Sequence, residues 1–422
     1  MSKYPEYSVY KDSGVESIGD IPEHWENMKL KFLGEALIGL TYSPSEIVNE
    51  SSGILVFRSS NVQNSKIDYD DCVYVDKEVQ EKLITKIGDI LICSRNGSIN
   101  LVGKNALIDE LSAGVTFGAF MTIFRSQNYS FLRYFFNSQN FKNQSGLFST
   151  STINQLTTGV LNNIVAPIPK SIIEQQQIAA FLDNKTAHLD TLIEKKQQMI
   201  GLLNEKRIAL ITQAVTKGLD LTVPMKDSGV EWLGNVPKHW GVMRISHVSI
   251  LKSGDAIVSE QIGDTGTYPV YGGNGLRGYF ENFNHDGDYI LIGRQGALCG
   301  NINYGYGKFW ASEHAVVVHP TLPLNFKWLG ETLRVMNLNQ YNVSSAQPGL
   351  AIANIVCLKI PFPTVQEQNN IALYIENETT KLDRMINTIQ SAIAKLQEYR
   401  TALITAAVTG KIDVRTLTPH EG

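Results

Sequence analysis

The stretch KDSGVESIGDIPEHW at residues 11–25 returns as KDSGVEWLGNVPKHW at residues 226–240. These two copies, called here the His-Trp motifs, are identical at ten of fifteen positions without a gap. Chance does not produce such a match, and an internal repeat decides the architecture before any single element is considered. The chain therefore consists of two halves that begin in the same way.

Two further pairs of stretches follow in the same order in each half. EKRIALITQAVT at residues 205–216 matches EYRTALITAAVT at residues 398–409, an offset of 193 residues. A weaker pair lies between them, GDILICSRNG at residues 88–97 and GDYILIGRQG at residues 287–296. Each half thus carries a His-Trp motif, a variable globular segment and a long helical segment. A duplicated frame with divergent inserts predicts one scaffold that carries two different recognition domains.

The helical segments, residues 171–215 and 365–409, have apolar residues seven apart, except where Lys196 interrupts the first series. This spacing over about four heptads is typical of a coiled coil. The predicted seam residues are Leu182, Leu189, Leu203 and Leu210 in the first segment and Ile375, Leu382, Ile389, Leu396 and Leu403 in the second. The pattern also predicts an interleaved stripe, at Ile178, Leu192, Met199, Met385, Ala392, Tyr399 and Ala406.

Two packing partners are open to each helix. Each helix could pack on its own globular domain, or the two helices, which share one register, could pair with each other. Because a globular segment separates them along the chain, we expect an antiparallel pair with a globular domain at each end. At 1.5 Å per residue each helix would be about 60 Å long, and that length would fix the distance between the two domains.

The variable segments, residues 26–167 and 241–361, are typical of short strands joined by loops. An aromatic-rich stretch at residues 129–142 predicts a core helix. The predicted strands lie at residues 54–58, 72–75, 89–93, 121–125, 289–293 and 315–319.

The composition limits the class of protein. A net charge of −4 and a pI near 6.1 give no support to DNA binding, because phosphate contacts call for a basic surface. A locally basic face, or cations from a partner subunit, would still permit it. The four cysteines contain no Cys-x-x-Cys pair, which argues against a structural zinc site and a disulfide framework. Without an apolar leader or an 18-residue apolar run, we expect a cytoplasmic protein with no membrane partner.

Polar residues that follow the repeated Gly-Asp stretch are candidates for contact with DNA. Arginine reads guanine and amides read adenine through paired hydrogen bonds in the major groove. Alternatively, Arg95 and Arg294, which the repeat aligns, tie down their own turns or meet a phosphate. Since both halves keep this arginine, the unmatched neighbours are better candidates for sequence discrimination. The candidates are Arg95, Asn96, Ser98, Asn100, Lys104, Arg277, Arg294, Gln295 and Lys308.

Catalytic signatures are missing from the sequence. No Pro-Pro dipeptide occurs, so the Asp/Asn-Pro-Pro-Tyr/Phe motif of amino-methyltransferases is absent. There is no Walker A motif, and the eight histidines form no metal-ligand spacing. We expect His24 and His239 to pack or hydrogen-bond beside their tryptophans rather than to catalyse a reaction. These observations predict a protein without a catalytic site or a metal.

The His-Trp motifs, the Gly-Asp core, the Pro-x-Pro before each long helix and the terminal ALITAAVTGKIDV together resemble the specificity subunits of type I restriction-modification systems. The resemblance covers essentially the whole chain. It implies an α+β fold in which two α/β target-recognition domains are separated by a long antiparallel two-helix coiled coil, with an internal pseudo-two-fold repeat. The implied segments are target-recognition domain 1 at 1–170, a central helical region at 171–216, target-recognition domain 2 at 217–363 and a C-terminal helical region at 364–422.

The resemblance also implies partners. Each recognition domain would read one half of a bipartite, asymmetric site on double-stranded DNA. The coiled coil would bind two modification subunits, which carry S-adenosylmethionine and methylate adenine at N6. Restriction subunits would add ATP- and Mg-dependent translocation and cleavage, and this chain itself would hold no cofactor. Two alternatives stay open: a fragment of a fused methyltransferase-nuclease, and a scaffold that gathers proteins without reading DNA.

Overall fold

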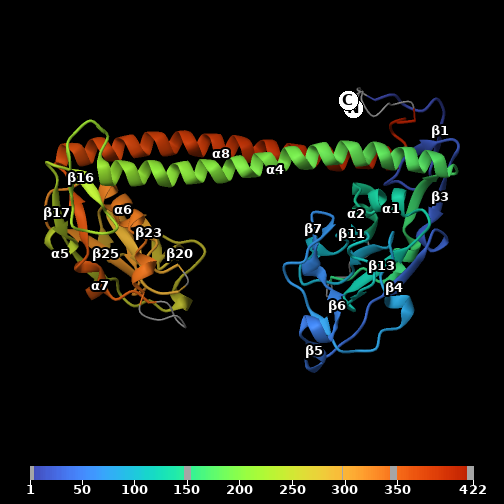
Figure 1. Cartoon of the computed structure of the whole chain (residues 1–422), viewed down its shortest axis with the longest axis horizontal. Coiled ribbons are helices and arrows are strands. Elements are labelled where there is room, and N and C mark those ends of the chain that lie inside the picture. Colours follow the sequence, from blue (N-terminus) through green and yellow to red (C-terminus); the bar gives the residue numbers. More distant parts are fainter. Residues whose placement is uncertain (1–3, 147–153, 297, 343–348, 416–422) are drawn as a thin grey trace. The chain divides into compact units, whose positions relative to one another are not determined.

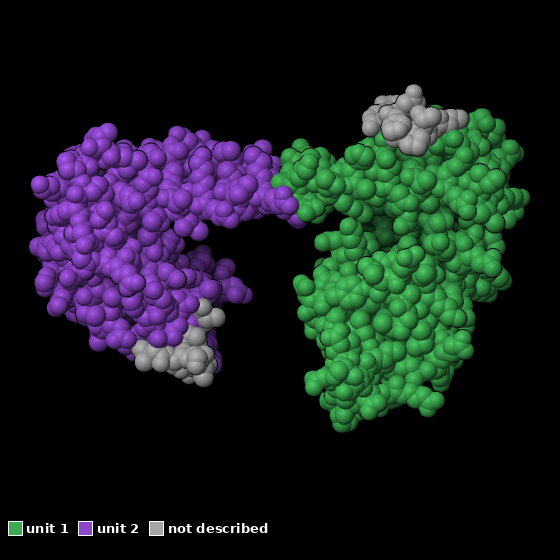
Figure 2. Space-filling model, viewed as in Figure 1, with its two compact units in different colours: residues 1–196, 391–422 green, residues 197–390 purple. Residues whose placement is uncertain are grey.

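The computed structural model describes residues 4–146, 154–296, 298–342 and 349–415. The chain divides into two compact units, one made of Met1–Lys196 with Ser391–Gly422 and the other of Gln197–Gln390 (Figure 2). The boundary falls inside both long helices, so each unit contains one part of each helix. The predicted division into four segments follows the helix ends instead and stays a prediction.

The repeated motifs form the same small elements in both units. Each His-Trp motif folds into a two-stranded antiparallel hairpin in which Lys11 is opposite Ile21 and Lys226 is opposite Val236. The strand after each hairpin pairs with the strand that contains the Pro-x-Pro. The pairs are β1 (Tyr10–Asp12) with β2 (Asp20–Pro22), β3 (Trp25–Lys29) with β14 (Val165–Pro169), β15 (Met225–Asp227) with β16 (Asn235–Pro237), and β17 (Gly241–Arg244) with β26 (Lys359–Phe362).

Two four-stranded sheets form the globular part of the first unit (Figure 1). In order, the first sheet contains β11 (Asn105–Leu107), β10 (Ile90–Cys93), β13 (Met121–Arg125) and β4 (Glu35–Ile38). The second contains β12 (Thr116–Phe117), β6 (Ile54–Phe57), β9 (Tyr74–Val75) and β5 (Ile47–Val48). Every residue of β10 is buried, which fits its continuous apolar sequence. A short hairpin of β7 (Val62–Gln63) and β8 (Lys66–Ile67) lies beside β11.

The second unit repeats this arrangement although its sequence differs. Its first sheet contains, in order, β18 (Ser249–Ser253), β25 (Ala315–Pro320), β22 (Tyr289–Gly293) and β23 (Ile302–Gly305). Its second contains β20 (Gly275–Phe280), β19 (Tyr268–Gly272), β24 (Lys308–Ala311) and β21 (His285–Asp286). In both units one strand pair between the second-sheet strands is parallel, β12 with β6 and β19 with β24. The two globular domains therefore share one fold.

Short helices complete each domain. They are α1 (Tyr129–Phe135), α2 (Gln139–Gly146) and α3 (Thr158–Asn163) in the first unit, and α5 (Ile245–Val248), α6 (Phe326–Val335) and α7 (Ile352–Val356) in the second. The aromatic stretch at residues 129–142 lies in the core, as predicted, but forms two helices instead of one. The hydroxyl of Ser138 donates to the carbonyl of Phe135 and accepts from the amide of Phe141, which ends α1 and starts α2.

The two long helices, α4 (Ile172–Lys217) and α8 (Val365–Val408), are antiparallel neighbours in each unit (Figure 1). In the first unit Nε of Arg400, late in α8, donates to Oδ1 of Asp190 at 2.8 Å. In the second unit Arg207, late in α4, forms an ion pair with Asp383, early in α8. The two bridges are related by the 193-residue repeat, so the same Asp-Arg pair closes the helix pair in both units.

The predicted seam lies between the helices. Among the nine seam residues, six are buried and three are half-buried: Leu182, Leu203, Ile375, Leu382, Ile389 and Leu403, and then Leu189, Leu210 and Leu396. The interleaved stripe, by contrast, was predicted wrongly along the middle of the helices, although Ile178 and Ala406 are buried. Leu192, Met199, Met385 and Tyr399 are 43% to 46% exposed, while Ile193 and Ile386 are buried. The second seam position of the middle heptads therefore lies four residues after Leu189 and Leu382, and not three residues after them.

A glutamate, buried in the first unit and half-buried in the second, joins each His-Trp motif to the start of a long helix. In the first unit Glu174 accepts hydrogen bonds from Nε1 of Trp25 at 2.9 Å and from the hydroxyl of Tyr7, and lies 2.9 Å from Nε2 of His24. In the second unit Glu367 is 3.0 Å from Nε1 of Trp240. Each histidine thus bonds the glutamate that its neighbouring tryptophan bonds, as expected for a structural role.

The same tryptophans also contact the ends of the long helices. Gly410, which follows α8, has a φ of +68°, and Gly218, which follows α4, has a φ of +77°. A Cβ added at Gly410 would lie 2.3 Å from Pro22 and 3.4 Å from Trp25, and one at Gly218 would lie 3.1 Å from Trp240. Each His-Trp motif therefore holds the start of one long helix and the end of the other.

Substitution Ile389→Asp tests the seam. It places an unpaired carboxylate where the side chain is only 8% exposed, so we expect a loss of about 3–5 kcal/mol in the free energy of unfolding, measured by denaturant titration. Gln390→Asp, at the exposed neighbouring position, serves as the control and should cost less than about 1 kcal/mol. Equal stability of the two variants would show that the seam assignment is wrong.

Substitution Glu367→Gln tests the hydrogen bonds by which Glu367 joins its His-Trp motif to the start of α8. Burial raises the pKa of Glu367, but hydrogen bonds from His239, Trp240 and Thr364 outweigh it and lower the pKa to about 2. A depressed carboxylate pKa stabilises the fold above pH about 4.5, and this contribution disappears as the pH falls towards 2.

Because the carboxylate is 32% exposed, we expect Glu367→Gln to cost about 1–2 kcal/mol at pH 7. The difference from the parent chain should shrink as the pH falls from about 4.5 to about 2. Glu376→Gln, which breaks the exposed pair with Lys327, is the control and should cost less than about 1 kcal/mol. If the difference in free energy of unfolding between Glu367→Gln and the parent chain does not change with pH, the carboxylate of Glu367 does not stabilise the fold through these hydrogen bonds.

Candidate nucleic-acid interface

In the first unit, the end of the central strand β10 meets the start of β13. The backbone amides of Ser94 and Arg95 both donate to the carbonyl of Phe120, at 2.9 and 3.1 Å. The carbonyl of Ser94 in turn accepts the amide of Leu156 at 2.8 Å. These bonds, called here the backbone frame, hold the segment that carries the side chains predicted to contact DNA.

The second unit has the same backbone frame at the end of β22. The amide of Arg294 donates to the carbonyl of His314 at 2.9 Å, and the amide of Leu350 donates to the carbonyl of Arg294 at 2.9 Å. Two further bonds correspond, from Gly39 to the carbonyl of Met121 and from Gly254 to that of Ala315. The two domains therefore present their strand ends on the same hydrogen-bonded support.

This frame corrects the predicted match between Arg95 and Arg294. By strand pairing, Cys93 is opposite Met121 and Gly293 is opposite Ala315, so Arg294 takes the place of Ser94. Arg95 corresponds to Gln295, and each forms an isolated bridge to the loop that follows, with Gln155 and Gly349. The second strand contains one additional residue after its Gly-Asp, and this shifts the apparent alignment. Arg95 is therefore not a residue that both halves share.

In the first unit, five candidates gather around the end of β10. Arg95 is exposed, and its guanidinium lies 5.1 Å from the centre of the Phe120 ring. Nδ2 of Asn96 donates to the hydroxyl of Ser59, and its Oδ1 accepts from the amide of Ser98. Asn100 is on the exposed turn that follows. The half-buried Lys104 accepts the amide of Cys93 through its carbonyl.

In the second unit, the four candidates divide into two places. Arg294 is half-buried and donates from Nη1 to the hydroxyl of Ser253 at 3.2 Å, while Gln295 is exposed. The stem of Arg277 lies over Gly272 in the glycine-rich stretch that packs beside this strand end. Lys308 lies at the far end of β24, with Nζ 4.5 Å from the Phe283 ring. The structure thus brings Arg277 towards Arg294 and Gln295 but leaves Lys308 away from them.

The glycines of this stretch are needed for close backbone approach. A Cβ at Gly293 would lie 2.1 Å from the carbonyl oxygen of Gly273, and Gly275 has a φ of +96°. The glycines of residues 268–275 therefore serve a turn and a close approach of the backbone to β22.

The sequence did not single out Phe120, His314 and Phe283. Phe120 is 58% exposed and lies under Arg95, and Phe283 is 39% exposed and lies under Lys308. His314 occupies the position of Phe120, and Nε2 of its ring lies 3.1 Å from Oε1 of Glu313. A bulky residue directly before a buried strand, after small residues such as Gly118 and Ala119, is the signal that points to Phe120.

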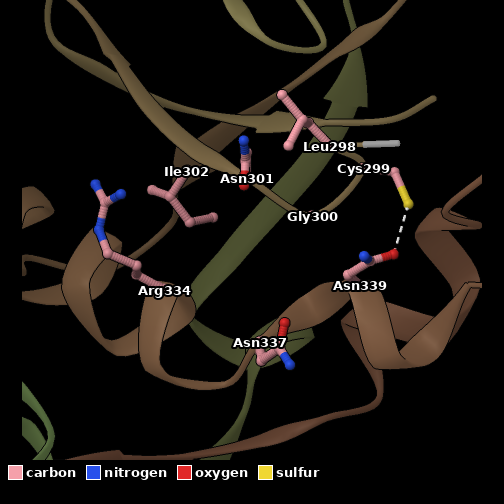
Figure 3. A pocket seen from close by; sticks show the side chains of 8 residues that line it. All are labelled: Leu298, Cys299, Gly300, Asn301, Ile302, Arg334, Asn337 and Asn339. Carbon is pink, nitrogen blue, oxygen red and sulfur yellow. Dashed lines mark hydrogen bonds between the residues drawn. The ribbon is translucent and has the colours of Figure 1, made fainter. Parts of the chain in front are cut away.

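One small pocket of about 140 Å³ lies in the second unit, apart from these candidates (Figure 3). Sγ of Cys299 donates to Oδ1 of Asn339 across it at 3.0 Å. Its lining is Leu298, Cys299, Gly300, Asn301, Ile302, Arg334, Asn337 and Asn339. Ligand pockets have volumes of about 300 Å³ or more, so this one is small. Within the described ranges, no group of three or more His, Cys, Asp or Glu side chains could hold a metal, and no helix could cross a bilayer.

Comparison with known proteins gives relatives of one kind. The chain is 23% identical to the type I restriction enzyme EcoKI specificity subunit of Escherichia coli K12, over 94% of this chain and 91% of that protein. It is 48% identical over 122 residues to the EcoprrI specificity subunit of Escherichia coli, a stretch that covers 29% of each chain. A solved structure from a type I R-M system has the same fold, with a TM-score of 0.65 and 15% identity over 92% of this chain and 98% of that one.

A family model places the chain among these relatives. The model for the type I restriction modification DNA specificity domain matches twice, at residues 22–201 and 237–395. Each match begins within a His-Trp motif and extends into a long helix, so the model follows the internal repeat. Because the two matches together cover well over half of the sequence, the chain belongs to the DNA-specificity family of type I restriction-modification systems.

Proposed function

We propose that each globular domain reads one half of a bipartite, asymmetric DNA site. The observation that supports this most is the shared backbone frame at the ends of β10 and β22, which carries unlike side chains in the two units. Arg95 is exposed in the first domain where Gln295 is exposed in the second. Arginine pairs with guanine and glutamine with adenine, so the two domains would read different bases. Arg95, Asn96, Ser98, Asn100, Arg294 and Gln295 remain the proposed contacts there.

The long helices are proposed to set the gap between the two half-sites. α4 is continuous over 46 residues, which corresponds to about 70 Å. α8 is continuous over 44 residues. A paired helix is stiff compared with a loop, and a stiff connection between two recognition domains would act as a spacer.

We further propose that the helices bind two modification subunits. Leu192 and Met385 are related by the 193-residue repeat and are 43% and 45% exposed, although both are apolar. Exposed apolar side chains that recur along one helix face mark contact surfaces for other proteins, and Met199 and Tyr399 continue the two rows at heptad spacing. Two equivalent surfaces fit two copies of one partner. S-adenosylmethionine would then enter with the modification subunits, and ATP and Mg with restriction subunits.

Single-molecule methylome sequencing of the source strain, with and without the gene for this chain, tests the proposal. We expect deletion to remove N6-methyladenine from one gapped, bipartite motif, because the modification subunits would lose their guide to the site. Restoring the gene from a plasmid is the control and should restore the motif. If a strain with active modification subunits keeps every methylated motif after deletion, the chain is a scaffold that does not select DNA.

A further inference from the structure

The shared frame isolates one position at which the two domains differ most. Phe120 and His314 each precede a buried strand, and the carbonyl of each accepts the amide that follows β10 or β22. Their next residues, Met121 and Ala315, are opposite Cys93 and Gly293 in the sheets. The backbone at this position is thus the same in both domains while the side chain is not.

The position of Phe120 is unfavourable in free energy for the isolated chain. It is 58% exposed, so most of its ring would face water in the isolated chain. The guanidinium of Arg95 lies over it, at 5.1 Å from the ring centre. Ile99 and Leu101, on the turn after the same strand, are also 44% and 39% exposed. An exposed aromatic ring beside a cation and other apolar side chains indicates a surface that a ligand covers.

We propose that Phe120 is a specificity-determining residue, which contacts the C5 methyl group of a thymine in the half-site read by the first domain. Apolar side chains, phenylalanine included, recognise this methyl group in the major groove. Arg95, held by its stacking on Phe120, is placed to donate to a neighbouring base. This inference rests on the proposed function, since it names a residue that would select bases within one half-site.

The equivalent position in the second domain fulfils the same role with different chemistry. Nε2 of His314 lies 3.1 Å from Oε1 of Glu313, and its carbonyl accepts the amide of Arg294, the residue before the exposed Gln295. Its ring and this carboxylate offer hydrogen bonds in place of an apolar contact. The two half-sites therefore differ in part because of the side chains at positions 120 and 314.

The test uses full-length Phe120→Ala and His314→Ala chains in strains that lack the original gene, followed by methylome sequencing. Phe120→Ala should relax one thymine position of one half-site, with discrimination reduced about tenfold, and leave the other half-site unchanged. His314→Ala should relax only the other half-site. Because Phe120 is exposed, the melting temperature of its variant should stay that of the parent chain.

Phe32→Ala is the matched control. Phe32 is 68% exposed and also lies under a cation, Lys31 at 4.9 Å. It precedes β4, whose first residue Glu35 is opposite Arg125, so it lies at the other end of β13 from Phe120. We expect its variant to methylate the original motif.

A second readout removes the methyl group from the DNA instead of the ring from the protein. With the assembled methyltransferase complex, uracil in place of the proposed thymine should weaken binding about as much as Phe120→Ala does, and weaken the variant no further. An unchanged motif with Phe120→Ala, or a uniform loss of methylation with the motif kept, would overturn the inference. If deletion of the gene removes the motif in the same strain, the proposed function survives that failure.

Discussion

The tryptophan of each His-Trp motif holds two helix ends at once, and the rest of the structure depends on this contact. Trp25 bonds Glu174 at the start of α4 and packs near Gly410 at the end of α8. Trp240 does the same for Glu367 and Gly218, with the two helices exchanged. In the first unit the start of α4 therefore lies with the end of α8, and in the second unit the start of α8 lies with the end of α4. The antiparallel direction follows from this pairing before any seam residue is considered.

Two ion pairs also fix the register of the helix pair. Asp190 with Arg400 and Asp383 with Arg207 are the same pair of repeated residues, used once in each unit. Such exposed or half-exposed bridges contribute little free energy, but they distinguish one alignment from another. The seam supplies the stability, since its leucines and isoleucines are buried or half-buried. Stability and alignment thus come from different residues of the same helices.

The architecture could be predicted from the sequence, because the internal repeat marks the His-Trp motifs and the long helices that build it. Heptad spacing predicted the seam, and the repeat predicted two halves built in the same order, but the hairpins of the His-Trp motifs were not predicted. The prediction failed where one residue changes which way a side chain faces. The interleaved stripe lies at Ile193 and Ile386 and not at Leu192 and Met385, and an additional residue before β22 moved Arg294 out of line with Arg95. Such single-residue shifts reverse the facing of a strand, and only strand pairing reveals them.

The candidate site shows the same limit. Polarity and position after a strand led to Arg95 and Gln295, both exposed at the shared frame. Neither rule could find Phe120, because a phenylalanine in sequence is usually a core residue. Its exposure depends on how the backbone hydrogen bonds of Gly118 and Met121 place this turn, a tertiary effect. The two units therefore share the backbone frame and differ in the exposed side chains that it carries.

Our central proposal is that paired helices fix the spacing of two recognition domains. Its most direct test removes one heptad from each helix, residues 193–199 and 386–392, which leaves both Asp-Arg bridges in place. Seven residues span about 10 Å of helix, close to three base pairs of DNA. Methylome sequencing should then show the same two half-sites with a gap about three base pairs shorter. The same half-sites at the original gap would contradict the account.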